Sequence, residues 1–388
     1  MFTIQTMNKI SPVGLDRFEP ECYSVSDAQT APQGILVRSA KLLDMSFNPE
    51  LLAISRAGVG VNNIPLDRCS EAGIAVFSTP GANANAVKEL VLCAMLMGSR
   101  DIPGAIHWVR EQAEITEVST VVEKGKSAFV GPELYKKTLG IIGLGAIGSL
   151  VANAAIALGM DVCGYDPYLS VESALRLDRH IRVVKDIRDL YKCADYITIH
   201  IHYTAKTEKM INAEAIASMK RGVRFINLAR GEIVDDEAIL AALDTGWVAA
   251  YITDFPNNRL LTAPHVIAMP HLGASTPESE QNCAVMAVDE LKDYLENGNI
   301  RNSVNLPNVA MDRSGVQRLC IIHKNVPGML ASITALFSRD SVNVENLSNK
   351  SKGDYAYTMV DLSAAVGQNV LDDVAHLDSV IRVRSIVW

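Results

Sequence analysis

The chain has 388 residues, of which 48% are hydrophobic and 21% are charged, and its formal net charge is −8 at pH 7. This length suggests two or three domains, and the composition is typical of a globular protein in water. The negative charge argues against a nucleic-acid binder that works by neutralising phosphates, because repulsion would oppose the contact.

The seven cysteines are scattered and form no CxxC pair. We therefore expect buried thiols in a reducing compartment, without disulfides and without a metal site. The first residues, Met1–Gln5, lack the basic and then apolar pattern of a signal peptide. The most apolar run, Leu90–Met97, is too short to cross a bilayer. A cytoplasmic protein that contacts no membrane is the expectation.

From residue 34 onward, short apolar runs alternate with helix-like stretches. Helices are expected at 87–98 and 146–158. A third is signalled by acidic residues at 235–237 and by Gly246 just past its end. The predicted strands lie at 34–37, 52–55, 138–142, 161–165, 196–199, 223–226 and 249–252. This alternation predicts an α/β fold with a doubly wound, mainly parallel sheet whose faces are covered by helices.

The C-terminal part of the chain follows a different pattern. A long amphipathic helix is expected at 276–296, and a polar linker follows at 302–315. Beyond it come strand, helix, strand, strand, helix and strand, at 318–322, 328–339, 342–347, 355–362, 370–377 and 380–387. This is the split βαβ order of a ferredoxin-like domain, and its position past a linker makes it a separate domain.

A glycine-rich turn lies between a predicted strand and a predicted helix. The run Gly143-Leu144-Gly145-Ala146-Ile147-Gly148 fits G-x-G-x-x-G, the pattern that lets backbone approach a pyrophosphate at a helix N-terminus. Asp166 ends the next strand, close to the spacing of about twenty residues expected for a ribose-binding carboxylate. A carboxylate there would repel a 2′-phosphate, and the next basic residue is Arg176. The cofactor is therefore expected to be NAD.

Several stretches together resemble the D-2-hydroxyacid dehydrogenase family. They are 143–148, Asn227–Gly231 and Pro270–Thr276, and Asn83–Leu90 also fits, so the resemblance covers most of the first 305 residues. It implies a Rossmann-type cofactor domain and a flavodoxin-like, discontinuous substrate domain. The implied bounds are 1–96 and 271–305 for the substrate domain, 97–270 for the NAD-binding domain and 316–388 for the C-terminal domain.

The resemblance makes Arg230 and His271 the catalytic pair. Arg230 follows a strand at the carboxyl end of the sheet, where ligands bind in such folds, and its planar guanidinium can hold a carboxylate bidentately. His271 would act as the general acid/base, since its pKa lies near operating pH. The implied cofactor contacts are Gly143, Gly145, Ala146, Ile147, Gly148, Asp166, Ala229, Asp254, His271 and Gly273.

One position departs from the family. The family places a Glu shortly after the Asp-Phe-Pro stretch, where it pairs with the His, and that position resembles Asn258 here. An amide cannot stabilise an imidazolium as a carboxylate does. We therefore expect His271 to work with a less elevated pKa, which favours hydroxyl oxidation over ketone reduction at neutral pH. Asp254 is a substitute partner, although no pattern in the sequence shows that it reaches the His.

Two loops of the substrate domain resemble those of phosphoglycerate dehydrogenases. The implied substrate contacts are Arg38, Ser39, Arg56, Val59, Gly60 and Arg230. The backbone N–H groups of Val59 and Gly60 would hold the substrate carboxylate. Arg38 and Arg56 would neutralise a distal phosphate, although a single Arg is more often a solvated surface residue.

The segment from Arg318 to Ile386 resembles an ACT domain, a module that binds amino acids at domain–domain interfaces. The resemblance implies that His323, Asn325 and Asn343 hold an effector, for which L-serine is the expectation. The alternative is a domain that only dimerises. The family and the sheet edges of such modules imply a homodimer or homotetramer.

The expected activity is NAD-dependent oxidation of D-3-phosphoglycerate, a phosphorylated 2-hydroxy acid, to 3-phosphohydroxypyruvate, the first step of serine biosynthesis. Two alternatives stay open. One is a reductase of another small 2-oxo acid such as hydroxypyruvate or glyoxylate, and the other is a non-catalytic NAD-binding regulator. Coupling of the oxidation to 2-oxoglutarate is also open. The presence of both Arg230 and His271 argues against the regulator. Asn258, at the position of the family's Glu, keeps the regulator as an alternative.

Overall fold

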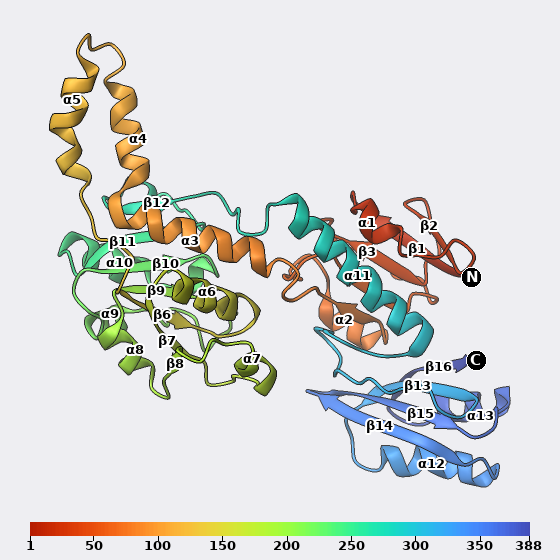
Figure 1. Ribbon diagram of the computed structural model, residues 1–388. Helices are drawn as coiled ribbons and strands as arrows, with labels where there is room; N and C mark the ends of the chain where they lie inside the picture. Colours follow the sequence, from red (N-terminus) through yellow and green to blue (C-terminus); the bar gives the residue numbers. More distant parts are fainter. The chain divides into compact units, whose positions relative to one another are not determined.

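The computed structural model describes residues 1–388, the side chain of Glu172 excepted. The chain forms two compact units (Figure 1). Unit 1 contains Met1–Ala82 and Glu280–Trp388, and unit 2 contains Asn83–Ser279. The expected boundary at 96/97 falls inside the helix α3 (Ala84–Arg100), which belongs wholly to unit 2. The C-terminal segment shares unit 1 with the N-terminal one.

Unit 2 is built on a seven-stranded parallel sheet with the order β12-β11-β10-β9-β6-β7-β8. The strands are β6 (Thr138–Ile142), β7 (Asp161–Tyr165), β8 (Arg182–Val183), β9 (Tyr196–Ile199), β10 (Val223–Asn227), β11 (Val248–Thr253) and β12 (Val266–Ala268). The strand order reverses between β6 and β9, as in a doubly wound dinucleotide-binding fold. The predicted Rossmann-type architecture is confirmed.

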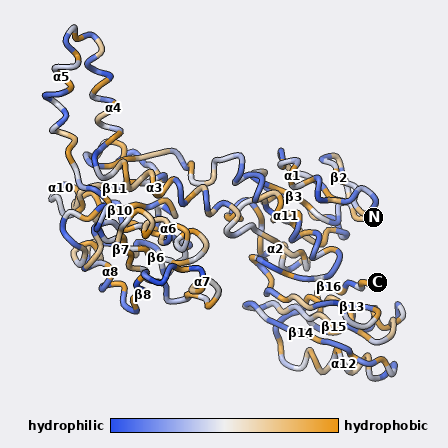
Figure 2. Tube along the Cα trace, in the orientation of Figure 1, coloured by the Kyte–Doolittle hydropathy of each residue, from blue (hydrophilic) through white to orange (hydrophobic). Residues whose placement is uncertain are grey.

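Helices cover both faces of this sheet and enclose two hydrophobic cores. The tube in Figure 2 shows the strands as mainly hydrophobic, as expected for a sheet that is buried on both sides. The helices of the unit are α3, α4 (Ile102–Glu111), α5 (Val118–Gly125), α6 (Ala146–Ala157), α7 (Val171–Leu175), α8 (Ile187–Cys193), α9 (Ala213–Ala217) and α10 (Asp236–Asp244), with short 3-10 turns η1 (Lys126–Phe129), η2 (Gly231–Ile233) and η3 (Leu260–Thr262). The sequence analysis predicted nothing for α4 and α5. They project from the unit as a hairpin and bury no residue (Figure 1).

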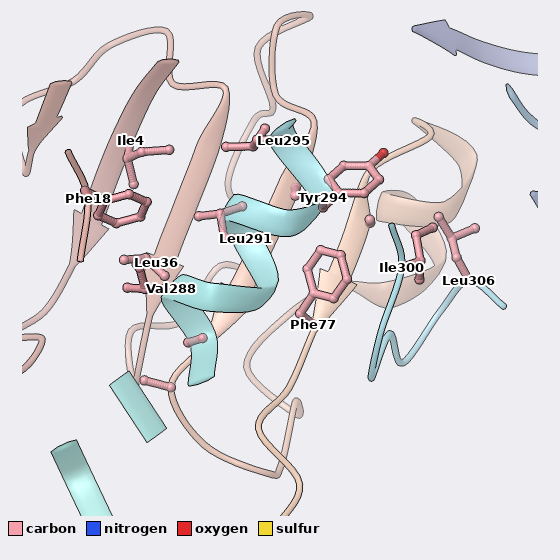
Figure 3. Packing of buried hydrophobic residues seen from close by; sticks show 14 of the residues in the cluster. Ile4, Phe18, Leu36, Phe77, Val288, Leu291, Tyr294, Leu295, Ile300 and Leu306 are labelled. Carbon is pink, nitrogen blue, oxygen red and sulfur yellow. The ribbon is translucent and has the colours of Figure 1, made fainter. Parts of the chain in front are cut away.

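The first part of unit 1 is a five-stranded parallel sheet with the order β2-β1-β3-β4-β5. Its elements are β1 (Phe2–Met7), α1 (Pro12–Leu15), β2 (Tyr23–Ser26), β3 (Gly34–Val37), β4 (Ala53–Arg56), α2 (Leu66–Glu71) and β5 (Ala75–Phe77). This order is the flavodoxin-like one that was expected. The long helix α11 (Pro277–Asn297) covers one face, and Val288, Leu291 and Tyr294 on it pack against the sheet (Figure 3).

The C-terminal part of unit 1 is a four-stranded antiparallel sheet with the order β14-β15-β13-β16. It consists of β13 (Gln317–Lys324), α12 (Met329–Arg339), β14 (Val344–Lys352), β15 (Tyr355–Leu362), α13 (Gln368–Ala375) and β16 (Val380–Val387). The ferredoxin-like order is confirmed. One face packs on α12 and α13, while the other face joins the core around α11.

That second face is fixed to the rest of unit 1 by polar contacts as well. Tyr357 Oη donates to the carbonyl of Gly298, at 2.6 Å, just beyond α11. Arg318 and Asp361, both fully buried, form a bidentate ion pair at 2.6 and 2.7 Å. Arg318 also donates to the carbonyls of Asn297 and Asp312, both at 2.8 Å. The C-terminal sheet is therefore an integral layer of unit 1.

All seven cysteines carry free thiols. The expectation that they are buried is wrong for Cys22 and Cys93, which are exposed. No helix among the described residues is both long and apolar enough to cross a membrane.

Candidate active site

The glycine-rich turn after β6 has the backbone that its sequence requires. Gly143 has φ +92°, a left-handed conformation that side chains disfavour, and a Cβ on Gly148 would lie 1.9 Å from the carbonyl oxygen of Gly143. Gly145 faces open space, with no atom within 4 Å of where its Cβ would be. The N–H groups of the first turn of α6, at Ala146 and Ile147, have no acceptor inside the helix. The turn therefore offers donors and room to an anionic group.

Asp166 lies beside this turn, at the end of β7. Its Oδ2 accepts from the N–H of Leu144 and its Oδ1 accepts from the N–H of Tyr168, both at 2.9 Å. These bonds hold the carboxylate next to the glycines, and its remaining lone pairs can accept from ribose hydroxyls. The residues present thus fit a dinucleotide with an unmodified ribose. Arg176, the next basic residue, follows α7.

Arg230, Asp254 and His271 follow β10, β11 and β12, three neighbouring parallel strands, so all three stand at the same edge of the sheet. Asn227 shapes the turn that carries Arg230. Its Nδ2 donates to the carbonyl of Arg230 at 2.9 Å, and its Oδ1 accepts from the N–H of Ala229 at 3.1 Å. Arg230 is half-buried, and its Nη1 donates to the carbonyl of Ala229 at 2.6 Å. The residues directly after β10 therefore fix the turn from which the Arg230 side chain extends.

Asp254 is a buried carboxylate that the surrounding protein leaves unpaired. It is 1% exposed, and neither carboxylate oxygen has a hydrogen-bond partner among the described side chains and backbone. Burial raises the pKa of Asp254 above its usual range, while the nearby His271 and Arg230 oppose that rise. The carboxylate of Asp254 therefore lies within electrostatic range of both side chains.

His271 itself is exposed, and its ring lies against Phe255 with 4.8 Å between ring centroids. Asn258, where the family carries its Glu, is also exposed. The buried carboxylate of Asp254 follows the neighbouring strand β11, and burial raises its pKa while His271 opposes that rise. The site thus combines an exposed imidazole, a guanidinium and a buried acid, a set that can move a proton and hold a carboxylate.

The predicted substrate loops lie in unit 1. Arg38 follows β3 and Arg56 is the last residue of the neighbouring strand β4, and Arg56 Nε donates to the carbonyl of Arg38 at 2.9 Å. Ser39 N–H donates to Asn8 Oδ1 at 3.2 Å, while Val59 and Gly60 are half-buried in the loop after β4. The structure therefore brings these residues to one edge of the flavodoxin-like sheet.

The sequence analysis missed Glu280, which pairs with Arg38 at 2.6 Å. Both side chains are about half exposed. The signal that points to Glu280 is its place in the first turn of α11, directly after the family stretch that ends at Thr276.

The three predicted effector residues do not meet within one chain. His323 is 2% exposed, and both ring nitrogens are engaged, with the carbonyl of Lys324 at 2.8 Å and Thr358 Oγ1 at 2.9 Å. Asn325 donates to the carbonyl of Gly353 at 3.2 Å, at one end of the β14–β15 hairpin.

Asn343 lies at the opposite end of that hairpin, where its N–H donates to Ser363 Oγ at 3.2 Å. Nine residues of β14 separate the two ends, roughly 30 Å at about 3.3 Å per residue. Besides Thr358, the side chain of Asn349 also reaches His323, at 3.4 Å from its Nε2. No sequence signal marked Asn349, because only the strand pairing brings it there.

Comparison with known proteins identifies the family. Residues 92–273 match the NAD-binding domain of D-isomer specific 2-hydroxyacid dehydrogenases, and residues 319–382 match an ACT domain like that of the AHAS small subunit. D-3-phosphoglycerate dehydrogenase of Haemophilus influenzae is 32% identical over 351 residues, which cover 87% of this chain and 81% of that protein. The chain belongs to the D-2-hydroxyacid dehydrogenase family.

Other relatives and solved structures agree. D-3-phosphoglycerate dehydrogenase of Bacillus subtilis is 35% identical over 360 residues, 88% of this chain and 66% of that protein. The crystal structure of NAD⁺-bound 3-phosphoglycerate dehydrogenase of Entamoeba histolytica matches with a TM-score of 0.61 and 26% identity, covering 78% of this chain and 98% of that one. The chain spans only 50 to 66% of the length of the first three curated relatives.

Proposed function

We propose that this chain is an NAD-dependent dehydrogenase that oxidises D-3-phosphoglycerate to 3-phosphohydroxypyruvate, the step that opens serine biosynthesis, in the cytoplasm. The observation that carries the proposal is the convergence of Arg230, Asp254 and His271 at the carboxyl edge of a dinucleotide-binding sheet. The names of the curated relatives support the choice of substrate.

In this proposal the residues of unit 2 divide the work. Arg230 holds the substrate carboxylate and polarises the oxygen on C2, and His271 removes the proton of the C2 hydroxyl. The turn at 143–148 and Asp166 would hold NAD, which would supply the acceptor for the hydride from C2. Ala229 and Gly273 would line the same edge of the sheet, where their backbone could approach the nicotinamide ring of NAD.

Asp254 is proposed as the positioning residue for His271. A carboxylate near an imidazole stabilises the imidazolium that forms when the hydroxyl proton arrives. Asn258 cannot supply that charge, and its exposure sets it apart from the buried carboxylate of Asp254. The expected preference for hydroxyl oxidation depends on how strongly Asp254 acts.

Arg38 and Arg56 are proposed to bind the substrate phosphate, with Ser39 and the backbone of Val59 and Gly60 beside them. Because Glu280 already pairs with Arg38, a phosphate would have to displace that carboxylate. A dianionic phosphate forms stronger charge-assisted hydrogen bonds than a half-exposed carboxylate, so the exchange is favourable.

The ACT domain is proposed to bind an amino-acid effector, L-serine being the candidate. Since Asn343 lies at the far end of the hairpin from His323 and Asn325, a site made of all three needs Asn343 from a second copy of the chain. This geometry supports the proposal of a homodimer or homotetramer.

The test is NADH production by the purified full-length chain with NAD and D-3-phosphoglycerate, with D-glycerate, D-lactate and D-2-hydroxyglutarate as competitors and with NADP as the control cofactor. Each reaction is run with and without L-serine. Selective turnover of phosphoglycerate with NAD supports the proposal. Tight NAD binding without turnover of any substrate would replace it by the regulator, and faster reduction of hydroxypyruvate or glyoxylate would replace it by the reductase.

A further inference from the structure

Two cysteines and an arginine form a cluster on unit 2, away from the edge of the sheet that carries Arg230 and His271. Cys163 lies in the middle of β7, and Arg182 on β8 is its partner in the strand register. Cys193 is the last residue of α8, the helix that packs on β7. Cys163 is buried, Cys193 is half-buried and Arg182 is exposed.

One nitrogen of Arg182 joins the two sulfurs. Its Nη2 donates to Cys193 Sγ at 3.1 Å and to Cys163 Sγ at 3.5 Å. Because both sulfurs lie within hydrogen-bond reach of the same atom, and both side chains belong to the same core cluster, they are near neighbours. None of the residues assigned above to cofactor, substrate or effector takes part in this cluster.

The two thiols stand in different environments. Burial and the neighbouring Cys193 raise the pKa of the Cys163 thiol to about 11, against the opposing effect of Arg182. Cys193 is accessible from the surface, and its sulfur accepts from the guanidinium of Arg182, the kind of environment in which reactive cysteines are found. This is the division of roles in a dithiol in which one sulfur is oxidised first and the other then attacks it.

We propose that Cys193 and Cys163, with Arg182, form an oxidisable dithiol site that hydroperoxides convert to an intramolecular disulfide. In the first step the Cys193 thiolate attacks a peroxide oxygen, an S–O bond forms and the O–O bond breaks. With hydrogen peroxide the leaving hydroxide takes up the thiol proton as water. In the second step the Cys163 sulfur attacks the Cys193 sulfenic acid, the S–S bond forms and a second water leaves. Two thiols are oxidised and one peroxide is reduced.

The test uses the reduced full-length chain, treated with hydrogen peroxide, blocked with iodoacetamide and digested without reductant for mass spectrometry. We expect two of the seven thiols to be lost and one peptide pair to appear, linked through Cys163 and Cys193 and separated again by dithiothreitol. The exposed Cys93 provides the matched control, and Cys93→Ser should form the same link at the same rate.

Two variants keep the proposal falsifiable. Cys193→Ser, at a half-buried helix end, should fold and should leave Cys163 unmodified. Arg182→Gln should form the link several-fold more slowly at neutral pH because the thiolate loses its donor. Oxidation of Cys193 only to sulfinic acid, linkage of Cys193 to any other cysteine, or a link that forms equally fast in Arg182→Gln would overturn it. None of these readouts requires dehydrogenase activity, so they are independent of the proposed function.

Discussion

Two buried acids, one in each unit, have opposite surroundings. Asp361, in the ACT sheet, is fully buried, and both of its oxygens accept from Arg318. Asp254, at the edge of the unit 2 sheet, is almost as deeply buried and has neither oxygen bonded. A buried charge without a partner costs stability, so a fold keeps one only where something else benefits from it. The difference fits a structural role for Asp361 and the positioning role proposed for Asp254.

The histidines repeat this contrast. His323 in the ACT sheet has both ring nitrogens bonded, whereas His271 is exposed at the edge of the unit 2 sheet. We expect His271→Asn to lower kcat for phosphoglycerate oxidation about 10³-fold, because the hydroxyl proton loses its acceptor. Steady-state NADH formation measures this. His107→Asn, on an exposed helix, is the control that should turn over normally. A rate near wild type in His271→Asn would remove His271 from the mechanism.

Substitution of Asp361, the paired acid, should lower the stability of the protein. Asp361→Asn leaves Arg318 buried without its counter-ion, and we expect the free energy of unfolding to fall by about 3–5 kcal/mol. Denaturant titration followed by circular dichroism measures it. In the same domain Asp373 pairs with Arg339 at the surface at 2.6 Å, and Asp373→Asn should cost about 0–1 kcal/mol. Equal losses in the two variants would mean that burial does not decide the strength of these pairs.

Glu290 on α11 is intermediate between Asp361 and Asp254, because only one of its carboxylate oxygens has a partner. It is 7% exposed, its Oε1 accepts from Asn302 at 2.7 Å, and its Oε2 has no partner. Burial and the neighbouring Asp289 raise its pKa to about 8, although Asn302 opposes the rise. A raised folded-state pKa stabilises the protein fully below the unfolded pKa, and this stabilisation is lost as pH rises through the folded value.

Wild type should therefore lose about 2–3 kcal/mol more than Glu290→Gln between pH 6 and pH 8.5. Unfolding titrations across that range measure the difference. Glu278→Gln, exposed on the same helix, should track wild type at every pH. Parallel curves for wild type and Glu290→Gln would show that Glu290 is already ionised at pH 6.

The smallest effect is expected at the unpaired acid itself. Asp254→Asn should lower kcat about tenfold, the equivalent of one pKa unit of lost imidazolium stabilisation, and should shift the pH–rate limb to lower pH. Its unfolding free energy at neutral pH should not fall, because the raised pKa means that the ionised carboxylate costs stability there. The dissociation constant of NAD, measured by fluorescence, separates this effect from cofactor binding. An unmoved limb with weaker NAD binding would make Asp254 a cofactor contact only.

Much of the cofactor site could be predicted because its geometry is local. The turn from Gly143 to Gly148 and the carboxylate of Asp166 are set by one strand–turn–helix unit and the strand after it. The doubly wound, parallel sheet also followed from the alternation of strands and helices, whereas the flavodoxin-like fold of the first sheet was implied by the family resemblance. The environment of Asp254 could not be predicted, since it depends on how the chain after β12 returns beside β11.

In the ACT domain, by contrast, the predicted effector site was not confirmed within one chain. Its element order was predicted correctly, yet the effector residues were grouped by family resemblance without counting strand length. An antiparallel hairpin of that length carries Asn325 and Asn343 to opposite ends. The burial of the second face of its sheet was also not foreseen. The sequence of β13 shows that both of its faces carry apolar residues, but it does not show which elements cover them.

The way the ACT sheet rests on α11 limits how this protein can be dissected. Cys320, Ile322 and Tyr357 from the sheet share a core with Tyr294 and Leu295 of the helix. Cutting the chain at the linker would expose this hydrophobic surface on both fragments. Each fragment would then be prone to self-association.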